Sequence, residues 1–168
     1  MTSPANLPFR IGHGYDLHRL QAGGRLMLGG IPAAFDLSPV AHSDGDVVLH
    51  ALVDAILGAI GQGDIGEHFP NTDDRWRNAE SRLFLEHAVN LAHKAGYAIG
   101  NADVTILAER PHIKPLKPAM RNHLANLLNI DPAQVNIKAG TNEGCDSIGR
   151  GEAIAADAVV LLVKTQRT

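Results

Sequence analysis

The most constraining feature of the sequence is the apolar segment at residues 45–60, GDVVLHALVDAILGAI. Its length and flanks predict an α-helix, and Asp44 or Asp46 can cap its first turn. Apolar residues cover so much of the helix circumference that the helix must be buried on more than one side. The chain therefore has to place other elements around this segment.

The rest of the chain alternates between strand and helix patterns. The expected elements are strands at 9–18 and 25–31, joined by the turn QAGG, a loop at 32–44, the buried helix, a turn-rich loop at 61–74, a helix at 79–96, a strand at 102–109, a helix at 117–130, and strands at 135–141 and 152–164. This order predicts an α+β fold, a mixed α/β sandwich with βαβ-like units and one sheet packed against helices.

Length and composition narrow the class of protein. A chain of 168 residues that is 45% hydrophobic suits one domain over 1–168, with 1–8 as a disordered leader. A formal charge of −3 without a Lys/Arg run argues against a nucleic-acid partner. Cys145 is the one cysteine, which excludes an intrachain disulfide. Without a signal peptide or a membrane-spanning run, we expect a cytoplasmic protein with no membrane partner.

The segment GHGYDLH at 12–18 holds a candidate metal site. In a strand, Asp16 and His18 project from the same face. On the buried helix, His50 lies four residues from both Asp46 and Asp54, so the three share one face. Asp16, His18 and His50 would form an open three-ligand zinc site, with Asp46 or Asp54 orienting His50 from behind. The alternatives are an exposed strand end and a hydrogen-bonded polar cluster in the core.

Two loops carry further polar groups. His42 and Ser43 directly precede the buried helix, where free N–H groups attract anions, although a surface histidine and a capping serine would look the same. GQGDIG at 61–66 follows a helix, so it does not satisfy the dinucleotide-binding pattern. Asp64 in it can accept hydrogen bonds from sugar hydroxyls or simply stabilise a turn.

The glycine-rich segment at 138–152 is the last candidate. Thr141 offers a hydroxyl donor, Glu143 an oxygen ligand for magnesium, and Arg150 a fork for phosphate or carboxylate. A polar hairpin is the alternative. These groups indicate an anionic ligand if they meet the metal site in space.

Five segments carry a family resemblance: RIGHGYDLHRL, AHSDGDVVLHALVDAILGAIGQGDIGEHFPNTD, ADVTILAERP, NIKAGTNE and GRGEAIA. From Arg10 to Lys164, in order and spacing, they resemble the 2-C-methyl-D-erythritol 2,4-cyclodiphosphate synthases of the non-mevalonate isoprenoid pathway. The resemblance implies a lyase that turns 4-diphosphocytidyl-2-C-methyl-D-erythritol 2-phosphate into the cyclodiphosphate and CMP. It also implies a homotrimer with active sites between subunits.

The resemblance further assigns residues. It implies one Zn²⁺ per chain on Asp16, His18 and His50, Mg²⁺ or Mn²⁺ held by Glu143, and transition-state stabilisation by His42 and Thr141. Arg150 would stand near a central channel that can take an isoprenoid diphosphate. The implied substrate-binding residues are Ser43, Asp64, Ile65, Gly66, Phe69, Pro70, Asn71, Thr72, Asp73, Ala108, Glu109, Arg110, Pro111, His112, Ile113, Lys114, Gly140, Asn142, Ser147 and Arg150.

Two positions depart from the family pattern. Ser147 replaces an aromatic residue in a loop that reads EGCDS, and His112 stands where lysine is frequent. Both departures predict altered contact with substrate. The alternative functions are a zinc-dependent phosphohydrolase that activates water and a non-catalytic trimer that binds isoprenoid diphosphates.

Overall fold

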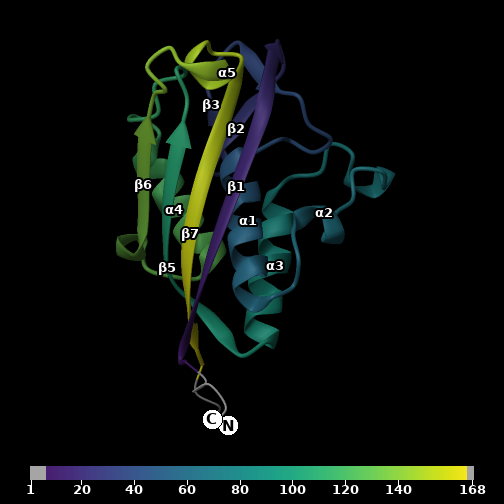
Figure 1. The fold of residues 1–168 in the computed structure, drawn as a ribbon, viewed down its shortest axis with the longest axis vertical. Helices are drawn as coiled ribbons and strands as arrows, with labels where there is room; N and C mark the ends of the chain where they lie inside the picture. Colours follow the sequence, from purple (N-terminus) through teal and green to yellow (C-terminus); the bar gives the residue numbers. More distant parts are fainter. Residues whose placement is uncertain (1–6, 166–168) are drawn as a thin grey trace.

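The structure, a computed structural model, describes residues 7–165 (Figure 1). Its elements are β1 Phe9–Ala22, β2 Leu26–Leu28, β3 Ile31–Ala33, β4 Leu37–Pro39, α1 Val47–Ile60, α2 Ile65–His68, η1 Asp74–Trp76, α3 Arg82–Lys94, β5 Tyr97–Leu107, α4 Lys117–Leu128, η2 Pro132–Gln134, β6 Val135–Gly140, α5 Asp146–Gly149 and β7 Ala153–Lys164. Of the expected leader, residues 1–6 lie outside the described residues. Pro8 already accepts a hydrogen bond from the Lys164 amide, directly before β1.

One sheet organises the chain. Its strand order is β4-β1-β7-β5-β6. β5 and β6 are parallel and are connected through α4, which makes one βαβ unit, while the other pairs are antiparallel. Helices α1, α3 and α4 cover one face of the sheet (Figure 1). The expected mixed α/β fold, with one sheet packed against helices, is confirmed.

The prediction for residues 25–31 is wrong. This segment is not one strand beside β1, because Gly29 and Gly30, with φ of 58° and 75°, turn the chain back. Two consecutive positive φ angles are typical of a tight hairpin turn. β2 and β3 therefore pair only with each other in a two-stranded sheet, while β1 continues to Ala22 and pairs with β7 and β4.

Other boundaries differ because of long-range pairing. β5 begins at Tyr97 rather than at residue 102, since its first residues pair with the end of β7. The expected loops contain short elements, β4 before α1 and α2 after it. The expected helices at 45–60 and 117–130 are confirmed as α1 and α4.

Asp46 fixes the start of α1. Its carboxylate accepts hydrogen bonds from the amides of Val48 and Leu49 in the first helical turn and from Gly29 and Gly30 in the β2–β3 turn. The side chain is fully buried. Burial raises the pKa of Asp46, while the hydrogen bonds from the backbone oppose this shift. Asp46 therefore ties the hairpin to the helix N-terminus.

Two glycines bring β1 directly onto α1. Gly12 and Gly14 lie on the buried face of the strand, the same face as Asp16 and His18. A Cβ atom on Gly12 would lie 1.7 Å from the carbonyl oxygen of Ala55. Only glycine permits such an approach of backbone to backbone. The strand is thus held close enough to α1 for its side chains to meet those of the helix.

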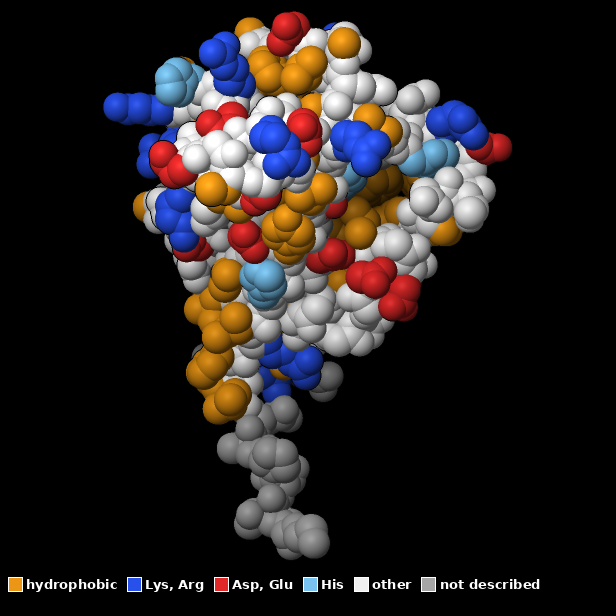
Figure 2. All heavy atoms as spheres, turned by 45° about the horizontal axis from the view of Figure 1, so that its top comes forward, with side chains coloured by type: hydrophobic (Ala, Val, Ile, Leu, Met, Phe, Trp, Pro, Cys, Tyr) orange, Lys and Arg blue, Asp and Glu red, His pale blue; other side chains and the backbone are white. Residues whose placement is uncertain are grey.

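The other face of β1 and β7 carries exposed apolar side chains, interrupted by the His13–Asp157 pair. Ile11 is 66% exposed, and its exposed neighbours on the two strands are Phe9, Tyr15, Leu17, Val159 and Val163. Figure 2 shows hydrophobic side chains gathered in a column at the lower left of the molecule. An exposed group of large apolar side chains of this kind is typical of an interaction site.

Candidate metal centre and active site

β1 and α1 bring three ligand groups together. Asp16 Oδ2 lies 3.0 Å from His50 Nδ1 and 3.2 Å from His18 Nε2, and the two histidine nitrogens are 3.3 Å apart. Asp16 and His18 come from one strand face, as the alternation predicts, and His50 comes from the buried helix. His13 lies on the opposite face, where it contacts Asp157. The structure therefore groups Asp16, His18 and His50 as a potential metal site.

The spacing and chemistry of this triad fit a small divalent ion. Tetrahedral ligands that bind zinc at about 2.0–2.1 Å lie about 3.3 Å from one another. Burial lowers the pKa of His18, with Asp16 acting in the opposite direction, so the ring favours its neutral, metal-binding form. Three protein ligands leave one tetrahedral position for substrate or water.

The residues within hydrogen-bonding distance of His50 Nε2, the ring nitrogen that faces away from the triad, are not those predicted. Asp46 is engaged by four amides, and Asp54 Oδ1 accepts a hydrogen bond from the Ile65 amide and so anchors α2. Neither orients the imidazole. His50 Nε2 instead lies 2.8 Å from Ser81 Oγ and 3.2 Å from Ser43 Oγ. Asp46 lies before α1 as its extended N-cap, and helical spacing alone could not reveal the partners of the two aspartates in other segments.

A cavity of about 620 Å³ opens beside the triad. It is formed between the end of β4, the start of α1 and the α2–η1 segment, which projects beyond α1 in Figure 1. His42 lies in its wall, with Nε2 3.3 Å from the carbonyl oxygen of Asp73. The sequence-predicted residues that line the cavity are Asp16, His18, His42, Ser43, His50, Ile65, Gly66, Phe69, Pro70, Asn71 and Thr72. Asp64 instead caps α2 through the Glu67 amide.

An aromatic wall completes this cavity. Phe69 stacks on Phe84 at a centroid distance of 4.3 Å, and Trp76 packs edge-on against Phe69 at 5.1 Å. Within residues 7–165, Trp76 Nε1 is the one buried side-chain polar atom without a hydrogen-bond partner. The sequence analysis did not identify Phe84, Trp76 or Ser81 as residues of the site. Phe69 and Trp76 flank the polar loop at 70–75, and this pattern was the signal in the sequence for an aromatic wall.

The remaining predicted residues form a second group. Ala108–Lys114 follow β5, and Thr141–Glu143 follow Gly140, the last residue of β6, so both loops lie at the carboxyl ends of two parallel strands. Such an edge is a common place for ligands. The loops are tied together, since the Ala108 amide donates to Gly140 and the Asn142 amide donates to Glu109. His112 and Lys114 are exposed here.

Exposed polar groups lie in the same loops. Thr141 donates a hydrogen bond to Glu143 Oε1 at 3.0 Å, and both side chains are exposed. Arg150 is held by Glu152 in a two-point ion pair. The departure EGCDS leads into the short helix α5, in which Asp146 accepts from the Gly149 amide and Ser147 is half-buried. The segment thus contains a helical turn rather than the polar hairpin that was the alternative.

Within a single chain, the triad cavity and the loops after β5 and β6 are separated. Leu17 of β1 and Leu107 of β5 both pair with Ala155, so the groups lie at the same end of the sheet but on opposite sides of β7. None of the residues of the second group lines the triad cavity. A ligand that contacts both groups needs a second copy of the chain or a different placement of the loops.

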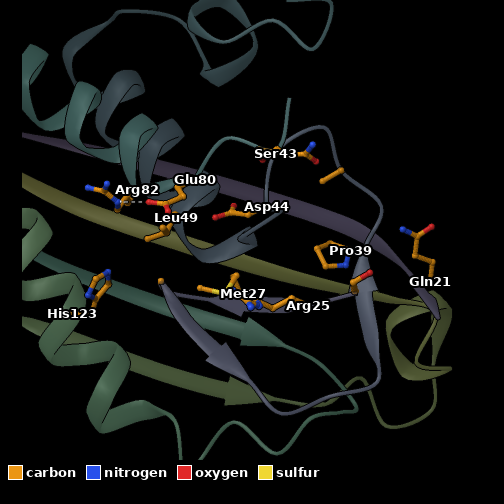
Figure 3. A pocket seen from close by; sticks show the side chains of 14 residues that line it. Gln21, Arg25, Met27, Pro39, Ser43, Asp44, Leu49, Glu80, Arg82 and His123 are labelled. Carbon is orange, nitrogen blue, oxygen red and sulfur yellow. Dashed lines mark hydrogen bonds and ion pairs between the residues drawn. The ribbon is translucent and has the colours of Figure 1, made fainter. Parts of the chain in front are cut away.

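A further cavity of about 550 Å³ lies on the other side of the Ser43–Asp44 segment (Figure 3). Its wall includes Asp44, Arg25 and His123, and it contains no triad residue. Of the predicted site residues, only Ser43 borders it. It is therefore separate from the candidate active site.

The fold and the triad define a mixed α/β protein with a histidine–carboxylate metal site beside an aromatic-walled cavity. The YgbB family matches residues 9–163, and the chain belongs to this family. It is 54% identical to the 2-C-methyl-D-erythritol 2,4-cyclodiphosphate synthase of Geobacter sulfurreducens over 153 residues, 91% of this chain and 98% of that protein.

A second relative and a solved structure agree with this family assignment. The chain is 52% identical over 161 residues to the chloroplastic 2-C-methyl-D-erythritol 2,4-cyclodiphosphate synthase of Oryza sativa subsp. japonica, covering 96% of this chain and 72% of that protein. It superposes on the solved structure of IspF from Plasmodium falciparum in its CDP complex with a TM-score of 0.83 and 36% identity, covering 94% of this chain and 97% of that one. Among residues 7–165, no helix combines the length and apolar character needed to cross a membrane.

Proposed function

We propose that this chain converts 4-diphosphocytidyl-2-C-methyl-D-erythritol 2-phosphate into 2-C-methyl-D-erythritol 2,4-cyclodiphosphate and CMP. The observation that carries the proposal is the convergence of Asp16, His18 and His50 at the wall of a cavity, in a chain of the YgbB family. The relatives' names supply the product, the resemblance of the sequence motifs supplies the substrate, and the site supplies the means of handling a diphosphate.

The residues present suit a cyclisation that uses the substrate's own nucleophile. The 2-phosphate already carries negative charge, so the protein has to position it in line with the β-phosphorus and stabilise the crowded charge. His42 and Ser43 lie in the segment before α1 and offer side-chain donors at the wall of the cavity. The aromatic wall excludes water from one side of the cavity, which favours cyclisation over hydrolysis.

The metal assignment is part of the proposal. Asp16, His18 and His50 would hold one Zn²⁺ per chain, and Glu143 would hold Mg²⁺ or Mn²⁺ when substrate is bound. These ions supply Lewis-acid stabilisation of the diphosphate oxygens. Thr141 would donate a hydrogen bond to the same diphosphate, and the loops after β5 and β6 would hold the cytidine. A CDP complex of a relative supports a cytidine nucleotide as ligand.

We also propose a homotrimer with each active site between two subunits. The apolar face of β1 and β7 would line the centre of the trimer. The two separated residue groups would meet across the subunit boundary, because a cyclic head-to-tail contact joins one edge of a subunit to the opposite edge of the next. Arg150 is the candidate contact for an isoprenoid diphosphate in the central channel, and the cytoplasm is the proposed location.

Product analysis tests the function directly. The purified protein is incubated with the diphosphocytidyl substrate and Mg²⁺, and CMP and the cyclic product are measured together. Equal amounts of the two are expected. A zinc-dependent phosphohydrolase would release CMP with a linear product, and a non-catalytic binding protein would release no CMP; either result contradicts the proposal.

A further inference from the structure

Ser81 stands at the N-cap of α3 but does not cap the helix. A serine at this place normally accepts a hydrogen bond from an amide of the first turn. Here the side chain makes no capping bond, and the residue is fully buried. Its hydroxyl is directed instead at two groups from another segment, His50 Nε2 at 2.8 Å and the Asp44 carboxylate. The hydroxyl is therefore committed to the metal site rather than to its own helix.

The donor direction in this chain of contacts follows from the groups themselves. A serine hydroxyl has one proton to donate, and an ionised carboxylate can only accept. Ser81 Oγ therefore donates to Asp44 Oδ1, which leaves its oxygen lone pairs to accept from His50 Nε2. The second carboxylate oxygen, Asp44 Oδ2, accepts from the Ser81 amide at 3.1 Å, so both groups are fixed relative to each other.

From these contacts we propose that Asp44 and Ser81 form a hydrogen-bonded relay that keeps the proton of His50 on Nε2 and so leaves the Nδ1 lone pair for the metal. Nδ1 is the nitrogen that faces Asp16 and His18. The metal-binding consequence rests on the proposed function, whereas the position of the proton does not. Ser81 and Asp44 are positioning residues, because they act on the metal site only through His50.

The surrounding structure holds the relay rigidly. The Asp44 amide donates to the carbonyl oxygen of Ala79, and the Asn78 amide donates to that of His42. These two backbone hydrogen bonds join the segment before α1 to the segment before α3, on either side of the relay. On its outer side, half-buried Asp44 borders the cavity of Figure 3, which keeps its charge hydrated. Ser43 Oγ, 3.2 Å from Nε2, accepts from the Gly45 amide and can share the same proton as a second acceptor.

Nitrogen NMR of the wild-type full-length protein tests the relay without any substitution. Long-range ¹H–¹⁵N spectra of histidine-labelled, metal-free protein are recorded at mildly alkaline pH, where imidazole is neutral. We expect His50 to carry its proton on Nε2. A His50 ring with the proton on Nδ1 would overturn the proposal, whether or not any variant folds.

Zinc affinity of variants gives the second measurement. Zn²⁺ binding is measured by competition with a chromophoric chelator for wild type, Ser81→Ala and Asp44→Asn, with Ser38→Ala as the control that removes another buried serine hydroxyl. Loss of the relay should weaken Zn²⁺ binding by about 10–100-fold, whereas Ser38→Ala should bind like wild type. In Ser81→Ala the His50 resonances should shift toward a mixture of the two neutral forms.

The NMR measurement and the zinc-affinity measurement distinguish failure of the relay from failure of the proposed zinc site. A folded Ser81→Ala protein with wild-type zinc affinity and an unchanged His50 spectrum contradicts the relay. If the wild type itself binds no Zn²⁺, the proposed zinc site is wrong, and the proton position on His50 still decides whether the relay exists.

Discussion

Gly14 packs against the carbonyl oxygen of Ala51 so closely that a Cβ atom on Gly14 would lie 2.0 Å from that oxygen. Gly14 is two residues before Asp16 on the same strand face, and Ala51 directly follows His50 on α1. The contact therefore sets the distance between the two elements that carry the metal ligands. Its removal should affect stability and the metal site together.

Gly14→Ala should destabilise the protein by about 1–3 kcal/mol, because the added methyl group must push β1 away from α1. Zinc affinity should fall as well, since Asp16 and His18 move with the strand. Urea unfolding and chelator competition measure the two effects.

Gly58→Ala is the matched control in the same helix. A Cβ atom at Gly58 meets nothing within 4 Å. This change should stabilise the protein by about 0.5–1 kcal/mol through helix propensity, without altering zinc binding. Equal stability of the Gly14→Ala protein and wild type would show that the strand can shift at no cost.

Zinc content should depend on each ligand of the triad. His18→Ala and His50→Ala each remove one of three ligands, so metal analysis after dialysis should show near-complete loss from about one zinc per chain. His93→Ala changes an exposed histidine of α3 and should keep full occupancy. Full zinc in the His50→Ala protein would remove this residue from the metal site.

Shared active sites should allow two inactive variants to restore activity together. His50→Ala affects the triad group and Thr141→Ala the group after β6. If each site is built from two neighbouring subunits, unfolding and refolding a 1:1 mixture should regenerate about a quarter of the intact sites, because a cyclic trimer then contains some correct neighbours. CMP release measures the recovery.

The control mixture combines His50→Ala with His18→Ala. Both changes damage the same group, so no arrangement of subunits gives an intact site, and activity should stay at the level of the separate variants. Recovery in neither mixture, with trimers present by light scattering, would contradict a site shared between subunits.

Order in the EGCDS loop should depend on Asp146. Hydrogen bonds from the Gly149 amide, and then from Asn142, hold the pKa of Asp146 below its ordinary value. A carboxylate with a depressed pKa in the folded state contributes stability above its unfolded pKa of about 3.9 and loses it as the pH falls through the folded value. Protection of the Ile148 and Gly149 amides should therefore persist at neutral pH and disappear in acid.

Hydrogen-exchange protection factors, corrected for the intrinsic rate at each pH, measure this effect. Asp146→Asn should lower protection at neutral pH and remove its dependence on acid. Protection that stays constant in the wild type from neutral to acidic pH would show that the short helix α5 does not need the carboxylate.

The sequence alone determined the elements whose signals are local. The apolar circumference of 45–60 requires a buried helix, and the period of two in β1 places Asp16 and His18 on one face, whatever the rest of the chain does. His50 could be added to the predicted metal site because a histidine on a buried, apolar helix needs a polar partner. The residues of the loops after β5 and β6 were assigned to the predicted site mainly through the resemblance of the family motifs.

Tertiary structure decided everything that depends on partners distant in sequence. The Gly29–Gly30 turn pairs β2 with β3, and β4 rather than β2 pairs with β1, so the hairpin is separate from the main sheet, against the local expectation. Asp46 and Asp54 were drawn to backbone amides, and Ser81, from a different helix, took their place behind His50. Hydrogen-bond partners of buried polar groups are fixed by which segments pack together, and periodicity along one segment contains no information about the segment that will face it.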